Sequence, residues 1–206
     1  SHYGGDPSRG GLSARQMLHD AVDIAVGADE LGVNNASFRV HHFAPQSAAP
    51  FPLLAAAAAR TQRIEVGTGV IDMRYENPLY LAEEAAALDL LADGRVALGV
   101  SRGSPEPADR GWEAFGYTGS TDPRGADIAR AKFELFLKAI SGEPMARAAE
   151  QPYGAPVRPG QGLRIEPHSE DLVRRIWWGA GSRETAENTG RQGLNPVSYT
   201  HLTLPT

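Results

Sequence analysis

The chain has 206 residues, of which 41% are hydrophobic and 22% are charged, and its formal net charge at pH 7 is −5. This composition is typical of a globular domain with its own core, and the acidity without a basic stripe argues against a nucleic-acid partner. The chain has no cysteine, which excludes disulfides, thiolate metal sites and cysteine nucleophiles and fits a reducing cytoplasm. It has no run of 18 apolar residues, so we expect no membrane span.

The first part of the chain predicts a helix, a strand and a second helix. Ser13 is a suitable N-cap for a helix that ends near Gly32. A short strand is expected over residues 36–41, and a helix made almost entirely of Ala and Leu over residues 48–60. In an alternating fold the first helix should follow a strand, so we expect the first strand to be missing from the amino end.

The middle of the chain predicts a strand–helix–strand unit. Small or polar residues alternate with apolar ones over residues 63–70, which is strand periodicity. Pro78 suits the first turn of the helix that follows, Asp93-Gly94 ends that helix, and a second strand covers residues 96–100. Such a βαβ unit pairs its two strands in parallel. Sites in parallel α/β folds are built at the carboxyl ends of the strands.

The last part of the chain predicts a helix over residues 124–140, a strand over 175–180 and a helix over 183–192. Residues 142–170 are rich in Pro and Gly and show no clear period. A connection of this length inside a domain is usually functional or mobile.

Strict alternation of helices and strands predicts an α/β fold with a parallel sheet and covering helices. Eight such units make a (β/α)8 TIM barrel, of which the chain holds about half. We therefore expect an incomplete barrel domain over residues 1–195, without the first strand and the C-terminal strands. The last eleven residues, PVSYTHLTLPT, resemble the in-frame translation of a sequencing adapter. We expect residues 196–206 to be an artefact tail.

The strand over residues 36–41 predicts a catalytic histidine. Neighbouring strand residues point to opposite faces, and the apolar Phe38 and Val40 should face the outer helices. Arg39 and His41 then face the barrel interior, with His41 at the carboxyl end, where an imidazole can transfer a proton. His42 should point the other way, so the pair does not form one metal site.

Alternation on the next two strands places further residues inside the barrel. Glu65 faces inward and is expected to form an interior ion pair with Arg39, because a buried charge must be paired. The third strand turns small residues inward, namely Ala97, Gly99 and Ser101. They either leave room for a flat ligand or simply fit crowded barrel packing.

Two loops that follow strand ends are suited to an anion. Arg102 lies just past a strand end, where its planar guanidinium can hold a phosphate through two hydrogen bonds. Gly181-Ser182-Arg183 opens a helix, where backbone N–H groups and a hydroxyl favour an anion. We therefore expect both loops on the same face of the barrel.

Several segments together carry a resemblance to a known family. They are HHF after the early strand, PFPLLAAAAARTQRIEVGTGV, ENPLYLAEEAAALDLLADGRVALGVSRGSPE and the later FGY. In order and spacing, residues 13–195 resemble the bacterial luciferase-like flavin-dependent oxidoreductases. The resemblance implies a barrel that binds reduced FMN at its strand ends and uses O2 to monooxygenate a small organic substrate. It also implies a separate flavin reductase and a homo- or heterodimer.

The resemblance assigns roles to individual residues. His41 matches the first histidine of the family's E-H-H, near the flavin ring, although Val40 replaces the glutamate. Gly69-Val70 matches a place where the family often has a non-prolyl cis peptide beside the ring. Arg102, with Ser101 before it, matches the phosphate-contacting arginine.

Further positions follow from the same resemblance. The phosphate loop is matched by Gly181, Ser182 and Arg183. The loop beyond the cis peptide supplies candidates for substrate contact, Asp72, Arg74 and Tyr75. Glu166-Pro167-His168 either lines the pocket or is a solvated loop.

Three alternative functions remain open. The same fold supports hydride transfer with the deazaflavin F420, which needs no oxygen. A cofactor-free barrel hydrolase and a non-catalytic flavin-binding relative are the others.

Overall fold

The computed structural model describes residues 3–4, 11–103, 106–154, 156–181, 183–191 and 193–197. The α-helices are α1 (Ala14–Glu30), α2 (Pro50–Arg60), α3 (Pro78–Leu91), α4 (Ala126–Ile140) and α5 (Arg183–Arg191). The main sheet holds β1 (Asn35–Phe38), β2 (Glu65–Asp72), β3 (Val96–Ser101), β6 (Ile176–Gly179) and β7 (Asn195–Val197). The remaining elements are the strands β4 (Ala146–Arg147) and β5 (Gly162–Leu163) and the 3-10 helices η2 (Gly111–Phe115) and η3 (Leu172–Arg175).

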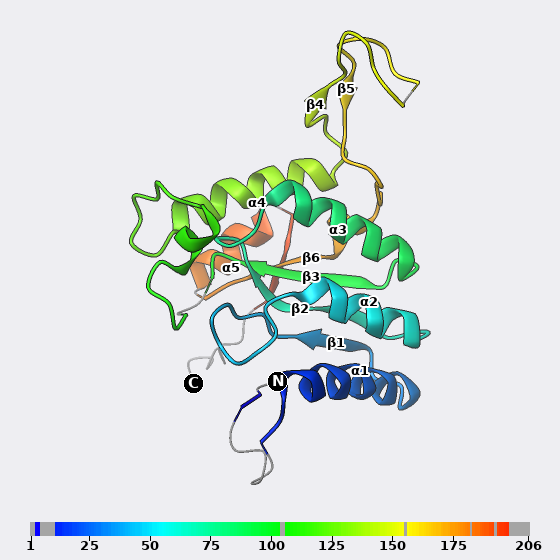
Figure 1. The fold of residues 1–206 in the computed structure, drawn as a ribbon, viewed down its shortest axis with the longest axis vertical. Coiled ribbons are helices and arrows are strands. Elements are labelled where there is room, and N and C mark those ends of the chain that lie inside the picture. Colours follow the sequence, from blue (N-terminus) through cyan, green and yellow to red (C-terminus); the bar gives the residue numbers. More distant parts are fainter. Residues whose placement is uncertain are drawn as a thin grey trace.

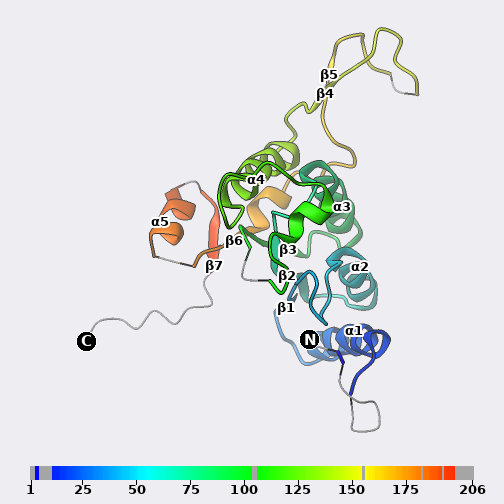
Figure 2. The ribbon, with the colours of Figure 1, turned by 60° about the vertical axis from the view of Figure 1, so that its left-hand side comes forward.

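The main sheet is parallel and curved. Its strand order is β1-β2-β3-β6-β7, and every neighbouring pair runs in parallel. The helices form an arc outside the strands (Figure 1, Figure 2). Within the described residues β1 and β7 do not pair with each other, so the sheet is open. This arrangement confirms the expected α/β fold and incomplete barrel.

Local capping explains where two of the helices begin and end. The Ser13 side chain accepts the backbone N–H of Gln16 at 3.1 Å and caps α1, as the sequence predicts. Asn77 caps α3 in the same way, and Pro78 occupies its first turn. Helix α3 ends before Gly94, whose φ of +77° suits a residue without a Cβ.

The hydrophobic core lies between the strands and the helices that cover them. Its largest fully buried side chains lie in or next to α2, β2, α3, β3, α4, η3 and β6, and they include Leu54, Ile64, Ile71, Leu81, Leu98, Phe136 and Ile176. Helix α3 and strand β3 lie in the centre, and all six residues of β3 are buried. Burial of this apolar surface is the main force that holds the helices against the sheet.

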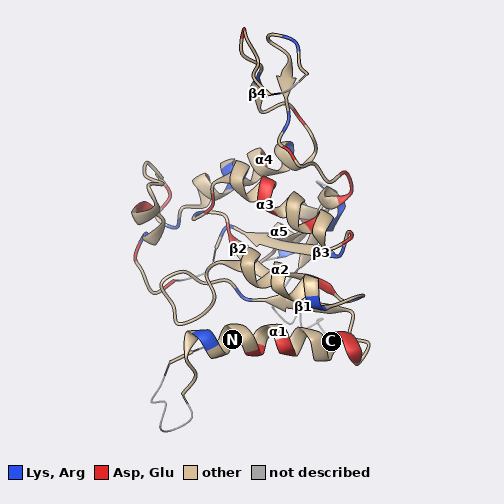
Figure 3. Ribbon diagram, turned by 45° about the vertical axis from the view of Figure 1, so that its right-hand side comes forward, with Lys and Arg blue, Asp and Glu red and all other residues tan. Residues whose placement is uncertain are grey.

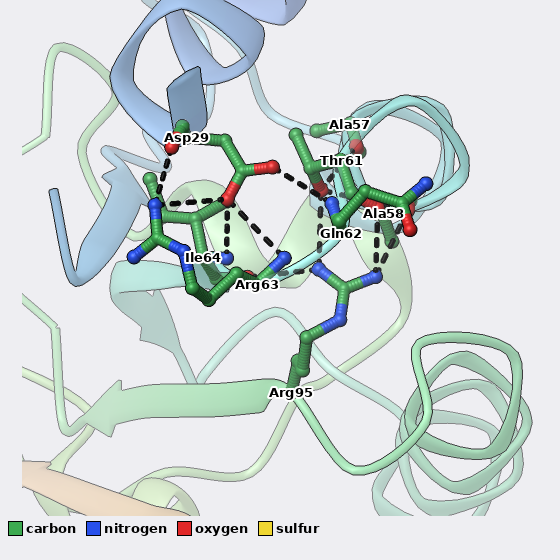
Figure 4. A network of polar contacts seen from close by, with 8 residues as sticks. All are labelled: Asp29, Ala57, Ala58, Thr61, Gln62, Arg63, Ile64 and Arg95. Carbon is green, nitrogen blue, oxygen red and sulfur yellow. Dashed lines mark hydrogen bonds and ion pairs between the residues drawn. The ribbon is translucent and has the colours of Figure 1, made fainter. Parts of the chain in front are cut away.

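A polar network fastens the amino end of β2 to α1 and α2 (Figure 4). The Asp29 carboxylate accepts the backbone N–H groups of Gln62, Arg63 and Ile64 at 2.8–3.2 Å. These hydrogen bonds, that of Gln62 first, lower the pKa of Asp29. The guanidinium of Arg95 donates to the carbonyls that end α2 and precede β2, those of Ala58, Thr61 and Ile64. The register of β2 is therefore held by side chains as well as by the ladder.

The long connection after α4 contains a two-stranded arm that the sequence did not predict. Strands β4 and β5 pair in antiparallel and project away from the sheet (Figure 1). The chain returns to the body at Ser169, whose hydroxyl donates to the buried Asp89 at 2.6 Å. Arg175, just before β6, donates to the same carboxylate oxygen at 2.6 Å. Asp89 thus joins α3 to the end of this connection.

One strand ends earlier than expected, and another strand was not expected at all. Strand β1 ends at Phe38 rather than at residue 41, because only its four residues have ladder partners on β2. Strand β7 was not expected, and it includes Pro196 and Val197, the first two residues of the segment assigned to an artefact tail. The domain boundary at residue 195 stays a prediction.

Lys and Arg are scattered along the described part of the chain, between Asp and Glu, and do not gather on one element (Figure 3). Among the residues that the structure describes, none of the helices has both the length and the apolar character that a membrane crossing requires.

Candidate functional site

A small cavity opens at the carboxyl ends of the first three strands of the sheet. Its volume is about 290 Å³, close to the lower end of the range of about 300–1,000 Å³ that is usual for ligand pockets. The lining residues follow β1, lie in the second half of β2, or end and follow β3, namely Arg39, Val40, His41, Gly69, Val70, Asp72, Ser101, Gly103 and Glu106. Four residues of the predicted site, His41, Gly69, Val70 and Ser101, therefore lie around one cavity.

The backbone of β2 is irregular where it borders this cavity. The peptide bond between Gly69 and Val70 is cis, as the family resemblance implied. The ladder between β2 and β3 shifts register between Thr68 and Ile71, on either side of this bond. The Thr68 hydroxyl donates to the carbonyl of Gly99 at 2.7 Å and satisfies the backbone there.

Close packing accounts for the glycine that faces inward on β3. A Cβ at Gly99 would overlap the carbonyl oxygen of Thr68 and lie 2.9 Å from Val70 Cγ1. Of the two interpretations left open by the sequence, the structure supports crowded packing for this residue. Gly99 also does not line the small cavity.

His41 is held between an arginine and a glutamate. Arg39 Nη2 lies 2.9 Å from His41 Nε2, and His41 Nδ1 lies 3.3 Å from Glu106 Oε1. Arginine can only donate, so Nε2 accepts, and Nδ1 carries the proton of the neutral ring and donates to Glu106. Burial raises the pKa of the Glu106 carboxyl, and His41 opposes part of that rise.

Glu106 is the polar residue of this cavity that the sequence analysis missed. Its side chain is 3% exposed, and Oε2 has no hydrogen-bond partner among the described residues. A buried carboxylate oxygen without a donor is unfavourable by roughly 1–3 kcal/mol, so this oxygen is suited to a donor group of a ligand. Its position in the sequence was a signal, because Glu106 follows the same strand end as Arg102. The spacing of residues along the chain does not show that the loop brings Glu106 to His41.

The expected ion pair between Arg39 and Glu65 does not form. Arg39 contacts His41, whereas Glu65 is exposed at the start of β2. The register of the sheet explains the error, because Asn35 is the residue beside Glu65. Arg39 therefore lies four residues further along, or about 13 Å at the usual rise per residue.

His42 belongs to an aromatic cluster on the other side of the chain from His41. Its ring stacks on Tyr75 with a centroid distance of 4.0 Å and an interplanar angle of 13°. Phe115 packs edge-on against both rings. Burial lowers the pKa of His42 and raises the pKa of Tyr75 to about 12, so both side chains are neutral near pH 7. His41 and His42 therefore have different surroundings, as expected, although β1 ends at Phe38 and neither histidine lies in the strand.

The other two candidates for substrate contact, Asp72 and Arg74, form a buried ion pair. Their side chains are 4% and 7% exposed, and Arg74 Nη2 lies 2.5 Å from Asp72 Oδ2. Asp72 lines the small cavity, but Arg74 and Tyr75 do not.

A larger cavity of about 670 Å³ lies beside the small one, between α4 and the ends of β3 and β6. Arg102 and Gly181 both line it, so the two anion-suited loops meet at one cavity, as expected. Ser101 and Gly103 line both cavities and form the border between them.

Three further candidates do not line this cavity or cannot be placed. Ser182 lies outside the described residues. Arg183 is exposed and donates to Glu187 at 2.8 Å, and its contact with a phosphate stays a prediction. Glu166-Pro167-His168 does not line either cavity, which favours the interpretation as a loop away from the site over a pocket-lining segment.

Comparison with known proteins places this arrangement in a family. A model of the family described as luciferase-like monooxygenase matches residues 3–203. The chain is 38% identical over 85 residues to 4-hydroxyprotoasukamycin monooxygenase of Streptomyces nodosus subsp. asukaensis, which covers 40% of this chain and 23% of that protein. It is 42% identical over 91 residues to F420-dependent glucose-6-phosphate dehydrogenase of Nocardia farcinica, and the aligned segment covers 41% of this chain and 27% of that protein.

A solved structure shows the same fold. The oxygenating constituent of 3,6-diketocamphane monooxygenase of Pseudomonas putida, in complex with FMN, superimposes with a TM-score of 0.71 and 21% identity. The superposition covers 91% of this chain and 53% of that one, so the chain spans about half the length of this neighbour. Because the family model matches nearly the whole sequence, the chain belongs to the luciferase-like monooxygenase family.

Proposed function

We propose that the chain forms part of an enzyme that uses reduced FMN and O2 to monooxygenate a small organic substrate. The observation that carries this proposal is the pair of cavities that meet at Ser101 and Gly103. One is small and bordered by strand backbone and by His41. The other is larger, and Arg102 is one of the residues that line it. A flat ring joined to a phosphate has the same two parts.

The described residues fit FMN in shape and charge. Peptide backbone and small side chains around Gly69, Val70 and Ser101 form a wall against which a flat ring can lie. Arg102 makes no ion pair among the described residues, so its charge is free for an anion. Glu106 Oε2 lacks a donor and can accept the hydrogen bond of a ring N–H group.

When bound, reduced FMN supplies the electrons for the reaction with O2. The chain's own residues bind, orient and protonate. Burial raises the pKa of the Glu106 carboxyl, and its contact with His41 makes it a candidate for passing a proton between the imidazole and a bound ligand. His41 contacts Glu106 through Nδ1, and its Nε2 accepts from the exposed Arg39 at the cavity. His41 is thus the proposed catalytic histidine, with Glu106 as its partner.

Cofactor titration tests the proposal. The full chain is titrated with FMN and, separately, with F420, and quenching of cofactor fluorescence gives the two dissociation constants. FMN should bind at least about 10-fold more tightly, a difference of about 1.4 kcal/mol. A preference for F420 would replace the monooxygenase proposal with F420-dependent hydride transfer, which the relative from Nocardia farcinica favours. Binding of neither cofactor would refute both.

Substitution of Arg102 tests the phosphate contact. Loss of a hydrogen bond to a charged group is worth about 1.5–3 kcal/mol. Arg102→Ala should therefore weaken FMN binding about 10- to 150-fold, while leaving binding of riboflavin, which has no phosphate, unchanged. Arg158→Ala is a matched control, because Arg158 is exposed on the projecting arm and lines neither cavity. Unchanged FMN affinity in Arg102→Ala would remove this residue from the site.

We further propose that a separate reductase supplies the reduced FMN, since the neighbour from Pseudomonas putida is named an oxygenating constituent. The whole protein is expected to act in the cytoplasm as a dimer. With FMN, NADH, O2 and an added flavin reductase, the protein should form a product that carries one added oxygen atom once a substrate is found, whereas the reductase alone should not form it. Sedimentation of the whole protein measures its oligomeric state.

A further inference from the structure

A buried ion pair packs against the turn that follows β3, which contains Arg102 and Gly103. Asp72 and Arg74 contact each other through both carboxylate oxygens, because Arg74 Nε lies 2.9 Å from Oδ1 and Nη2 lies 2.5 Å from Oδ2. Asp72 Oδ1 also accepts the backbone N–H of Arg74 at 3.0 Å. A carboxylate and a guanidinium joined in this way form one planar unit with little freedom to rotate.

This planar unit packs directly against Gly103. A Cβ at Gly103 would overlap Arg74 Nη2 and Asp72 Oδ2, and the φ of +92° is one that residues with a Cβ rarely adopt. The backbone N–H of Gly103 donates to Ser101 Oγ at 3.0 Å and closes the turn. Arg102 is the residue between them, so the backbone on both sides of it is held.

The remaining sides of Arg74 are held as well. Its guanidinium carbon lies 4.7 Å from the centre of the Trp112 ring, and Nη1 donates to the carbonyl of Arg124 at 3.2 Å. The carbonyl of Arg74 accepts from Lys132 Nζ at 2.6 Å. A Cβ at Gly125 would lie only 2.9 Å from Arg74 Cδ. Arg74 therefore joins the β2–α3 loop to η2 and to the start of α4.

We propose that the Asp72–Arg74 pair is a positioning element for the anion-binding turn, which holds Gly103 and thereby directs Arg102 into the larger cavity. This inference rests on the proposed function, in which Arg102 contacts the phosphate of FMN. A buried ion pair is a weak source of stability compared with apolar residues of similar volume. The role proposed here depends on the fixed geometry of the pair, which holds the backbone of the turn in place. Neither Asp72 nor Arg74 touches the phosphate.

The test compares FMN with riboflavin, which differ only in the phosphate. The measured quantity is the dissociation constant of riboflavin divided by that of FMN. Arg74→Lys keeps the charge and loses the planar fork, and it should lower this ratio about 3- to 10-fold, the effect of one weakened hydrogen bond. Asp72→Asn should lower it similarly and serves if Arg74→Lys does not fold. The control is Arg60→Lys, since Arg60 makes an exposed ion pair with Asp23 between α1 and α2.

Thermal unfolding first establishes which variants are folded. A folded Arg74→Lys or Asp72→Asn protein with the wild-type ratio would overturn the inference. Equal weakening of FMN and riboflavin would overturn it too, because a merely structural role lowers both affinities. Arg102→Ala separates the two proposals. If it removes the preference for FMN while the ion-pair variants keep it, only the positioning role fails. If Arg102→Ala keeps the preference, the phosphate assignment fails and the positioning role fails with it.

Discussion

Asp89 should be one of the most sensitive positions for the stability of this fold. Its side chain is 1% exposed and lies in α3, between the core and the returning end of the long connection. Oδ2 accepts from Ser169 Oγ and from Arg175 Nη2, each at 2.6 Å. Asp89 Oδ1 also accepts the backbone N–H of Val96 at 3.3 Å. Asp89→Ala removes all three bonds and leaves the Ser169 hydroxyl, the Arg175 guanidinium and the Val96 N–H without this acceptor.

The expected loss follows from the burial of the three groups. Breaking a fully buried ion pair by removal of one partner usually costs about 3–5 kcal/mol. The Arg175 side chain is 24% exposed, so water replaces part of the lost interaction. We therefore expect Asp89→Ala to lower the free energy of unfolding by about 2–3 kcal/mol, a large part of the usual 5–15 kcal/mol. Asp89→Asn keeps the shape and one acceptor oxygen and should lose less.

Urea unfolding followed by tryptophan fluorescence measures this loss. With the usual dependence of about 1–3 kcal/mol per molar urea, the midpoint should fall by about 1 M or more. Asp171→Ala is the matched control, because the Asp171–Arg174 pair is 3.5 Å long with side chains 66% and 82% exposed. That variant should stay within about 0.5 kcal/mol of the wild type. A loss below about 1 kcal/mol in Asp89→Ala, or an equal loss in the control, would refute the reasoning.

Three further predictions can be measured in the same way. Gly99→Ala should lower the free energy of unfolding by about 1–3 kcal/mol because the new Cβ overlaps a carbonyl. Gly27 lies in open space on α1, so Gly27→Ala should raise the free energy of unfolding by about 0.5–1 kcal/mol. A Gly99→Ala protein more stable than the Gly27→Ala protein would contradict the packing. Tyr75→Phe should be neutral or stabilising by about 1 kcal/mol, since the buried hydroxyl has no partner among the described residues, and a clear loss would show that the hydroxyl is bonded. Burial raises the pKa of Glu76 from its ordinary 4.5 to about 7, so the folded state holds this proton more tightly than the unfolded chain. The stability from the neutral carboxyl is full below pH 4.5 and is lost as pH rises through 7, by at most about 3 kcal/mol. The difference between wild type and Glu76→Gln should therefore grow between pH 5 and pH 7.5, and a constant difference would contradict the raised pKa.

Periodicity and caps were enough to predict most of the elements. The helices α1 to α5 and the strands β1, β2, β3 and β6 all lie where the sequence placed them, with boundaries a few residues off. Such patterns report local geometry, because a helix or strand buries one face at a time. The short strands β4, β5 and β7 carry too few residues to show a period, and they form only because a partner strand lies beside them.

For the candidate site, the sequence alone pointed to the strand ends and to His41, Gly69, Val70 and Ser101, which line one cavity. Only the tertiary structure decided what those residues touch. Alternation gives the face of a strand but not the register between strands, which is why Arg39 meets His41 rather than Glu65. Glu106 meets His41 across 65 residues of chain, and the Asp72–Arg74 pair meets Gly103 from another loop. These contacts depend on how three loops close over the sheet, and no local pattern records that closure.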